Sequence, residues 1–211
     1  MVKSEGLLGK MLENKYENDC WQNSQYVMGI DEAGRGPLAG PLVVACCVLP
    51  INYSNDKIND SKKLTAKKRE ALFKEIIKDA HYYNFKIVSP KQIDELNIYA
   101  ATKKAMNELS LSTNIHSLTI TDAMPLNRYN AISIIKGDAK SISIAAASIL
   151  AKVLRDHIML GYDILYPNYE YKKHKGYSTK RHIELLDIYG LSPICRLSYK
   201  PCKDRIQQKL F

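Results

Sequence analysis

An apolar segment that runs into two adjacent carboxylates and a glycine-rich turn constrains the fold of this chain more than any other feature. Val27 to Ile30 is apolar, and Asp31 and Glu32 follow it directly. The turn Gly34-Arg35-Gly36 comes next, before a second apolar segment from Leu42 to Leu49. Short apolar segments bounded by turn residues are typical of buried strands, so the stretch predicts strand, turn, strand. Adjacent carboxylates repel each other unless a cation neutralises them, and Mg²⁺ and Mn²⁺ prefer such oxygen ligands.

Two other interpretations fit parts of this stretch. The acidic pair would also fit a polar hairpin that carries surface charge. The segment from Gly34 to Ala39 fits the dinucleotide-binding pattern G-x-G-x-x-G/A, but that pattern needs a helix to begin at the glycines. Pro41 and a strand-like segment follow instead, so we reject the dinucleotide site. Because glycine lacks Cβ, Gly34 and Gly36 can bring backbone N–H groups close to an anionic ligand.

The charge balance favours a polyanionic partner. The 211 residues are enough for one large domain or a domain with an appendage, and Lys plus Arg number 31 against 22 Asp plus Glu, a net charge of +9. Nucleic acid fits this charge, although solubility or a compositional bias would also explain it. No apolar segment has the length of a signal peptide core or a membrane span, so we expect a cytoplasmic monomer with no membrane partner.

The five cysteines indicate a reducing compartment. Their number is odd and no C-x-x-C pair is present, so neither a disulfide framework nor a zinc site is predicted. Cys46 and Cys47 are neighbours in the second predicted strand and should point to opposite faces of the sheet.

Two further predicted strands also lead to acids. The segment 117–121 ends in Asp122, and the segment 131–135 is followed by Lys136-Gly137-Asp138. A fifth strand is expected over 82–88. If the acid-bearing strands are parallel, their carboxyl ends converge and the acids share one site.

Helices are predicted where apolar residues repeat at helical spacing. Thr65 should cap a helix to Asp79, Ser89 a helix from Pro90 to about Leu109, and Ser141 begins the strongest helix, to about Leu160. Ser178 or Thr179 should cap the last helix, to Tyr189. Asp156 fits two interpretations. It is either an acid of the site or the partner of Arg155 or Arg181 in an ion pair.

Two basic segments are candidate substrate contacts. Lys62 and Lys63, beside Ser61, could hold a phosphate, although ordinary solvated lysines fit the same pattern. The loop 169–177, which contains Lys175 and Tyr177, mixes cations with aromatic rings, as expected for contacts to phosphates and bases. A basic solvated loop is the alternative.

The motifs jointly resemble those of ribonuclease HII, the type 2 ribonuclease H family, from about Tyr26 to Pro201. The matching segments are 29–37 (GIDEAGRGP), 60–64 (DSKKL), 94–98 (DELNI), 136–138 (KGD), 146–153 (AASILAKV) with Arg155-Asp156, 174–177 (HKGY) and 196–201 (RLSYKP). One position departs from the family pattern. Ala123 stands where the family usually has glycine after the third acid, so the turn there is expected to differ.

The resemblance implies the fold and the domain boundaries. It implies an α/β ribonuclease H-like fold, with a five-stranded mixed sheet flanked by helices and a helical C-terminal appendage. Residues 1–24 would be a leader of unknown role, either a short helix or a loose segment, residues 25–165 the catalytic core, and residues 166–211 a helical substrate-contacting region.

The resemblance also implies the site. Asp31, Glu32 and Asp122 would bind Mn²⁺ or Mg²⁺, with Asp138 as the fourth active-site carboxylate. The turn Gly34-Arg35-Gly36 would recognise a ribonucleotide 2′-hydroxyl, and Tyr177 would stack beside the scissile junction.

The implied activity is endonucleolytic cleavage of RNA in RNA–DNA hybrids and of single ribonucleotides embedded in duplex DNA, as in ribonucleotide excision during replication and repair. Two metal ions would take part, leaving 5′-phosphate and 3′-hydroxyl ends. Two rivals are a non-catalytic hybrid-binding module and another two-metal nuclease, such as a junction resolvase, on the same fold.

Overall fold

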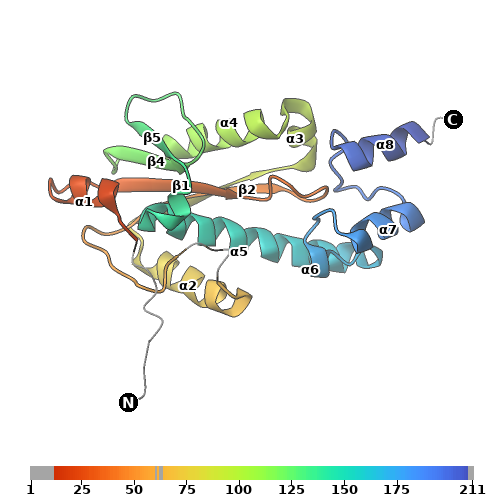
Figure 1. Cartoon of the computed structure of the whole chain (residues 1–211), viewed down its shortest axis with the longest axis horizontal. Coiled ribbons are helices and arrows are strands. Elements are labelled where there is room, and N and C mark those ends of the chain that lie inside the picture. Colours follow the sequence, from red (N-terminus) through yellow and green to blue (C-terminus); the bar gives the residue numbers. More distant parts are fainter. Residues whose placement is uncertain (1–11, 60, 62–63, 209–211) are drawn as a thin grey trace, which may run out of the picture.

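A mixed five-stranded sheet is the centre of the molecule. The computed structural model describes residues 12–59, 61 and 64–208, so the candidate phosphate contacts Lys62 and Lys63 lie outside the described residues. The sheet has the order β3-β2-β1-β4-β5 (Figure 1). Its strands are β1 (Val27–Ala33), β2 (Leu42–Val48), β3 (Tyr82–Val88), β4 (Leu118–Asp122) and β5 (Ala131–Ile134). β1 pairs antiparallel with β2 and β2 with β3, whereas β4 is parallel to β1 and β5 is parallel to β4. The predicted mixed sheet is confirmed.

Helices cover both faces of this sheet. Those of the core are α1 (Lys15–Trp21), α2 (Ala66–Asp79), α3 (Pro90–Leu96), α4 (Ile98–Ser110) and α5 (Ile142–Leu165), and those of the C-terminal appendage are α6 (Tyr171–His174), α7 (Lys180–Tyr189) and α8 (Lys200–Gln208). α5 and α2 lie on one face and α3 and α4 on the other, while the appendage extends past one end of the sheet (Figure 1). None of the helices within the described ranges is both long and apolar enough to cross a lipid bilayer.

The pleat of β2 divides the core into two layers. Val43, Ala45 and Cys47 pack toward α5 and α2. The alternate residues, which include Cys46, pack toward α4. Cys46 and Cys47 therefore point to opposite faces, as predicted, and all five cysteines are free thiols.

Helix α5 approaches the sheet closely because small residues face it. A Cβ on Gly29 of β1 would lie 2.2 Å from the backbone carbon of Ser143, so only glycine fits at this crossing. This contact places the first turn of α5 against the interior of β1.

The predicted helix 90–109 is two helices, which corrects the sequence prediction. Asn97 has φ 64° and ψ 160°, a backbone conformation that a helix cannot contain. The Asn97 side chain instead accepts a hydrogen bond from the backbone N–H of Ala100, 3.0 Å away, and so begins α4. α5 also continues to Leu165, beyond the predicted end near Leu160.

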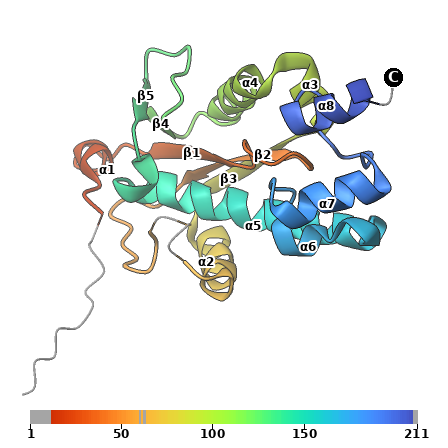
Figure 2. The same cartoon turned by 45° about the vertical axis from the view of Figure 1, so that its right-hand side comes forward.

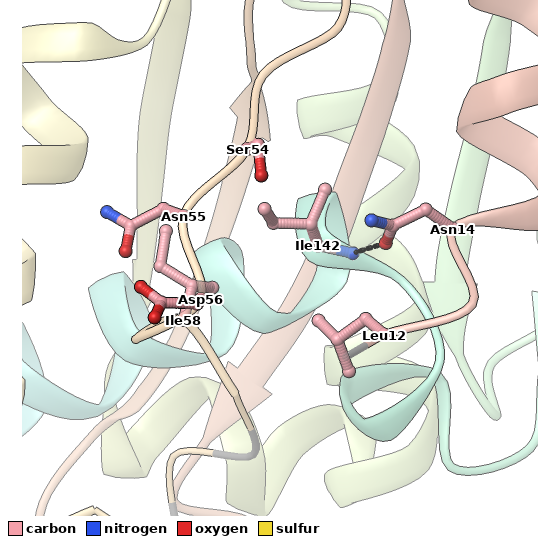
Figure 3. Close-up of a pocket in the computed structure, with 7 residues that line it drawn as sticks. All are labelled: Leu12, Asn14, Ser54, Asn55, Asp56, Ile58 and Ile142. Carbon is pink, nitrogen blue, oxygen red and sulfur yellow. Dashed lines mark hydrogen bonds between the residues drawn. The ribbon is translucent and has the colours of Figure 1, made fainter. Parts of the chain in front are cut away.

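Residues 12–21 contact the start of α5. Asn14 Oδ1 accepts a hydrogen bond of 2.8 Å from the backbone N–H of Ile142, and Figure 3 shows this contact beside Leu12 at a cavity of about 30 Å³. Glu17, fully buried in α1, accepts from the Ser143 N–H at 3.1 Å. Acceptors and a carboxylate at a helix N-terminus stabilise the helix, so this part of the predicted leader supports α5.

The appendage is joined to the core at α3. Asp94 of α3 accepts hydrogen bonds from the backbone N–H groups of Leu197 and Ser198, at 2.8 and 2.9 Å. Figure 2 shows α8 beside α3 as a consequence.

Candidate active site

A polar cavity of about 250 Å³ lies where the carboxyl ends of β1 and β4 meet α5 and the appendage. Its lining residues are Asp31, Glu32, Ala33, Gly34, Arg35, Gly36, Ser61, Asp122, Ser148, Lys152 and Tyr177. The cavity therefore gathers three acids, the glycine turn, one serine and one tyrosine that the sequence singled out. These residues are separated by as many as 146 positions in the chain. The parallel pairing of β1 with β4 brings Asp122 beside Asp31 and Glu32.

Asp31 is the most buried of the three acids. Asp31 lies in the second half of β1, and only 6% of the residue is exposed. Burial raises the pKa of Asp31 well above its usual value, and the charges of Glu32 and Asp122 raise it further. A hydrogen bond of 2.7 Å from the Glu32 N–H to Oδ1 opposes this shift.

The other two acids are oriented by contacts with their surroundings. Glu32 lies 3.5 Å from the guanidinium of Arg35, measured between Oε1 and Nη1. Asp122 Oδ1 accepts a hydrogen bond of 2.8 Å from the backbone N–H of Gly137. The residue after Asp122 departs from an ordinary strand end, because Ala123 has φ 50°, in the left-handed region.

Among the described residues, no group of three or more His, Cys, Asp or Glu side chains is arranged to hold a metal ion. The donor chemistry nevertheless suits a hard divalent cation, since carboxylate oxygens from Asp31, Glu32 and Asp122 face one polar cavity. A cation there would offset the repulsion that raises the pKa of Asp31.

Two of the sequence-predicted site residues do not line the cavity. Asp138 is buried in a 3₁₀ turn, Gly137–Ala139, behind Asp122. Lys175 extends its ammonium group to the carbonyl oxygen of Lys172, 2.6 Å away. The described structure therefore leaves both assignments as hypotheses.

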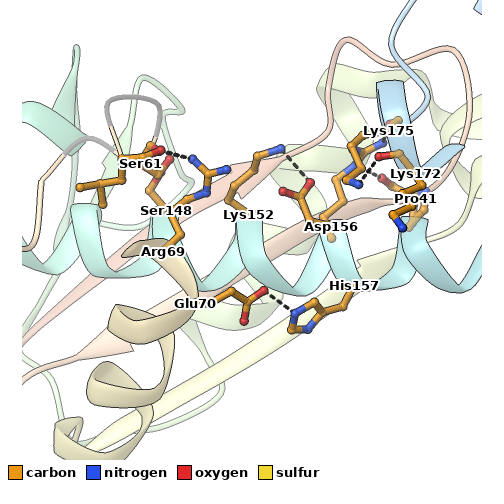
Figure 4. A network of polar contacts seen from close by, with 12 residues as sticks. Pro41, Ser61, Arg69, Glu70, Ser148, Lys152, Asp156, His157, Lys172 and Lys175 are labelled. Atoms are coloured by element: carbon orange, nitrogen blue, oxygen red, sulfur yellow. Dashed lines mark hydrogen bonds and ion pairs between the residues drawn. The ribbon is translucent and has the colours of Figure 1, made fainter. Parts of the chain in front are cut away.

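Two lining residues that the sequence analysis missed come from α5. Ser148 Oγ lies 2.8 Å from Ser61 Oγ, and Arg69 donates to the Ser61 carbonyl at 2.9 Å, which fixes Ser61 at the cavity (Figure 4). Lys152 lies one turn along α5 and bonds Asp156 at 2.8 Å. Of the two alternatives for Asp156, the ion pair is present, but its partner is Lys152 in place of Arg155 or Arg181. The spacing of four from Ser148 to Lys152 to Asp156 was the signal that could have placed them on one side of the helix.

The sequence comparison decides the family. The family model for ribonuclease HII matches residues 28–202. The chain belongs to the ribonuclease HII family.

Its relatives agree with this assignment. Ribonuclease HII of Listeria monocytogenes is 48% identical over 206 residues, which cover 96% of this chain and 79% of the relative. The crystal structure of ribonuclease H2 from Pyrococcus horikoshii OT3 superimposes with a TM-score of 0.76 at 28% identity, covering 87% of this chain and 98% of that one. Bst-RNase HIII, solved in complex with Mn²⁺, has a TM-score of 0.68 over 98% of this chain and 77% of that one, and its 15% identity shows a shared fold alone.

Family membership makes the chain a ribonuclease and implies endonuclease activity on RNA–DNA hybrids. The rival of a non-catalytic binding module is thereby excluded.

Proposed function

We propose that this ribonuclease HII cuts at single ribonucleotides embedded in duplex DNA as well as within longer RNA–DNA hybrids, leaving 5′-phosphate and 3′-hydroxyl ends. The observation that supports the proposal is the shared cavity, which sets Asp31, Glu32 and Asp122 beside the turn Gly34-Arg35-Gly36 and Tyr177. A ribonucleotide differs from its neighbours in DNA by one hydroxyl, so its recognition needs a close backbone approach such as this turn allows.

The acids would hold the metal. Asp31, Glu32 and Asp122 are the proposed ligands of Mn²⁺ or Mg²⁺, with Asp138 supporting them from the 3₁₀ turn behind Asp122. Divalent ions held there would supply activation of the attacking water and stabilisation of the leaving 3′-oxygen. The burial of Asp31 favours this role, because an oxygen ligand in a dry cavity interacts more strongly with a cation than a solvated one.

The remaining lining residues would hold the substrate. The N–H groups of the glycine turn would bind at the 2′-hydroxyl, and the ring of Tyr177, 44% exposed, would stack beside the junction. We assign phosphate contacts to Ser61, Lys62 and Lys63, and to Lys175 at the outer edge. The division of the chain at residues 24 and 165, a monomeric state and a cytoplasmic location also belong to this proposal.

The test is product mapping with Asp31→Asn as the matched variant. The substrate is a DNA duplex with one ribonucleotide, incubated with Mn²⁺, with Mg²⁺ or with EDTA. We expect the wild type to cut on the 5′ side of the ribonucleotide or directly next to it. Cleavage at either position should occur only when a metal ion is present. Asp31→Asn should lose cleavage by about 10³-fold or more while its affinity for the duplex changes little, because phosphate contacts dominate duplex binding. Normal cleavage by Asp31→Asn would show that the site is elsewhere, and equal cutting of an all-DNA duplex would favour the resolvase-type alternative.

A further inference from the structure

Two fully buried arginines hold the glycine turn from behind. Arg155 comes from α5 of the core, and Arg196 comes from the appendage, between α7 and α8. Both are 0% exposed. Within the described part of the chain, their hydrogen-bond partners are backbone carbonyls and one tyrosine hydroxyl, with no carboxylate among them. Buried arginines without an acidic partner are uncommon, so their placement calls for an explanation.

Arg196 binds the carbonyls of the turn itself. Its Nη2 donates to Gly34 O at 2.6 Å, its Nη1 to Arg35 O at 3.0 Å, and its Nε to Gly40 O at 3.0 Å. The hydroxyl of Tyr199 accepts from Arg196 Nη1 at 3.0 Å and donates to Arg35 O at 2.5 Å. The Arg35 carbonyl is therefore held by two donors of the appendage.

These carbonyls belong to particular peptide units. The carbonyl of Gly34 shares its peptide with the N–H of Arg35, and the carbonyl of Arg35 shares its peptide with the N–H of Gly36. A charged donor on the oxygen of a peptide strengthens its N–H as a hydrogen-bond donor, because chains of hydrogen bonds polarise one another. Arg196 thus acts on the two N–H groups that face the 2′-hydroxyl in the proposed function.

Arg155 packs against the turn at Gly34 and joins the segment that follows the turn to the Tyr177 segment. Its Nε donates to Pro41 O at 2.9 Å, and its Nη2 donates to Ala39 O at 3.3 Å and to Lys175 O at 3.0 Å. Its guanidinium carbon lies 5.8 Å from the centre of the Tyr177 ring. The proposed stacking residue and the proposed 2′-hydroxyl reader are therefore fixed against one side chain.

The two charges lie close together. Burial, together with the positive charge of Arg196, lowers the pKa of Arg155 to about 10, and burial is the larger cause. Burial also lowers the pKa of Arg196. Both groups remain charged at neutral pH, so two cationic donors hold the carbonyl oxygens of the turn and of the segment that follows it.

We propose that Arg196 and Arg155 are positioning residues for ribonucleotide recognition, which set the angle and donor strength of the Gly34-Arg35-Gly36 turn and lock it to Tyr177. The C-terminal appendage then contributes to the chemistry through Arg196 and Tyr199 and not only by covering the substrate. This inference rests on the proposed function, because the turn must read the 2′-hydroxyl for its positioning to matter.

The test compares Tyr199→Phe, Arg196→Lys and Arg155→Lys with Arg128→Lys. Arg128 is a suitable control, because it also donates to a backbone carbonyl, that of Ser110, and neither residue is among those that line the cavity. For each variant kcat and KM are measured on a duplex with one ribonucleotide, and the melting temperature is measured on the same preparation. Tyr199→Phe keeps the ring and removes one bond to Arg35 O, so it remains informative if an arginine variant does not fold.

We expect kcat to fall about threefold to tenfold in Tyr199→Phe and about tenfold to a hundredfold in Arg196→Lys and Arg155→Lys. KM should change by less than about threefold, because phosphate contacts dominate duplex binding. Arg128→Lys should keep the kcat of the wild type.

Three other results have clear meanings. If folded Tyr199→Phe and Arg196→Lys keep the kcat of the wild type, the inference is overturned. If kcat falls only in proportion to the folded fraction, the arginines are merely structural and the inference is also overturned. If the wild type does not cut at a single ribonucleotide, the proposed function fails, which is a different outcome from the failure of this inference.

Discussion

Gly34 and Gly36 differ sharply in what a methyl group would meet, although they stand two positions apart in one turn. A Cβ on Gly34 would lie 2.1 Å from Arg155 Nε, 2.6 Å from Arg155 Cδ and 2.9 Å from the Pro41 carbonyl oxygen. The Gly34 φ of +101° is also a conformation that alanine rarely adopts. A Cβ on Gly36 would meet only the Tyr177 ring, at 3.8 Å, which is an ordinary contact.

The magnitude for Gly34→Ala follows from two contributions. A non-glycine residue in a sparsely populated backbone region destabilises by about 1–3 kcal/mol. Displacing the Arg155 guanidinium breaks at least one charge-assisted hydrogen bond to Pro41, Ala39 or Lys175, which is worth about 1.5–3 kcal/mol. The expected loss in the free energy of unfolding is therefore about 2.5–6 kcal/mol, against less than about 1 kcal/mol for Gly36→Ala.

Urea denaturation followed by far-UV circular dichroism measures both variants against the wild type. The midpoint of Gly34→Ala should fall steeply at an unchanged slope, whereas Gly36→Ala should unfold near the wild type. Equal stability of the two alanine variants would refute the close packing of Arg155 against Gly34, and with it the argument that buried guanidinium groups define this turn.

Three further predictions concern stability. Ala123→Gly should raise the free energy of unfolding by about 1 kcal/mol, because φ 50° strains alanine and not glycine; an unchanged or lower urea midpoint would count against the strain. Burial lowers the pKa of His182 to about 4, below its ordinary 6.5, so the folded state is more stable when the His182 imidazole is neutral. The folded state should lose up to about 3 kcal/mol as pH falls from 6.5 to 4, and His182→Asn should flatten this part of the stability curve; a slope unchanged in the variant would contradict the assignment. Glu17→Ala should lower stability by about 1–3 kcal/mol, because it leaves the buried N–H of Ser143 without its acceptor; a midpoint equal to that of wild type would show that α1 does not support α5.

The strands, and the acids near the ends of β1 and β4, could be predicted from the sequence. Apolar segments bounded by turn residues located all five strands to within one or two residues, and the positions of Asp31 and Asp122 near strand ends were enough to predict that they share a site. Helix N-termini at Thr65 and Thr179 were also correct, because their side chains cap by local hydrogen bonds.

What could not be predicted depends on contacts between distant segments. Asn97 breaks a continuous helical pattern through a backbone conformation that no apolar period reveals. Arg155 and Arg196 look like surface residues in the sequence, because an arginine is rarely buried without an acid. Their carbonyl partners lie more than 100 positions away along the chain, apart from Lys175, and only the folded turn makes them acceptors.

The most direct test of the account is the cleavage of two duplexes of one sequence, one all DNA and one with a single ribonucleotide, in the presence of Mn²⁺ or Mg²⁺. The account predicts one cut, at the ribonucleotide, with a 5′-phosphate and a 3′-hydroxyl, and no cut in the all-DNA duplex. Equal cleavage of the two duplexes, or cleavage that persists in EDTA, would contradict it.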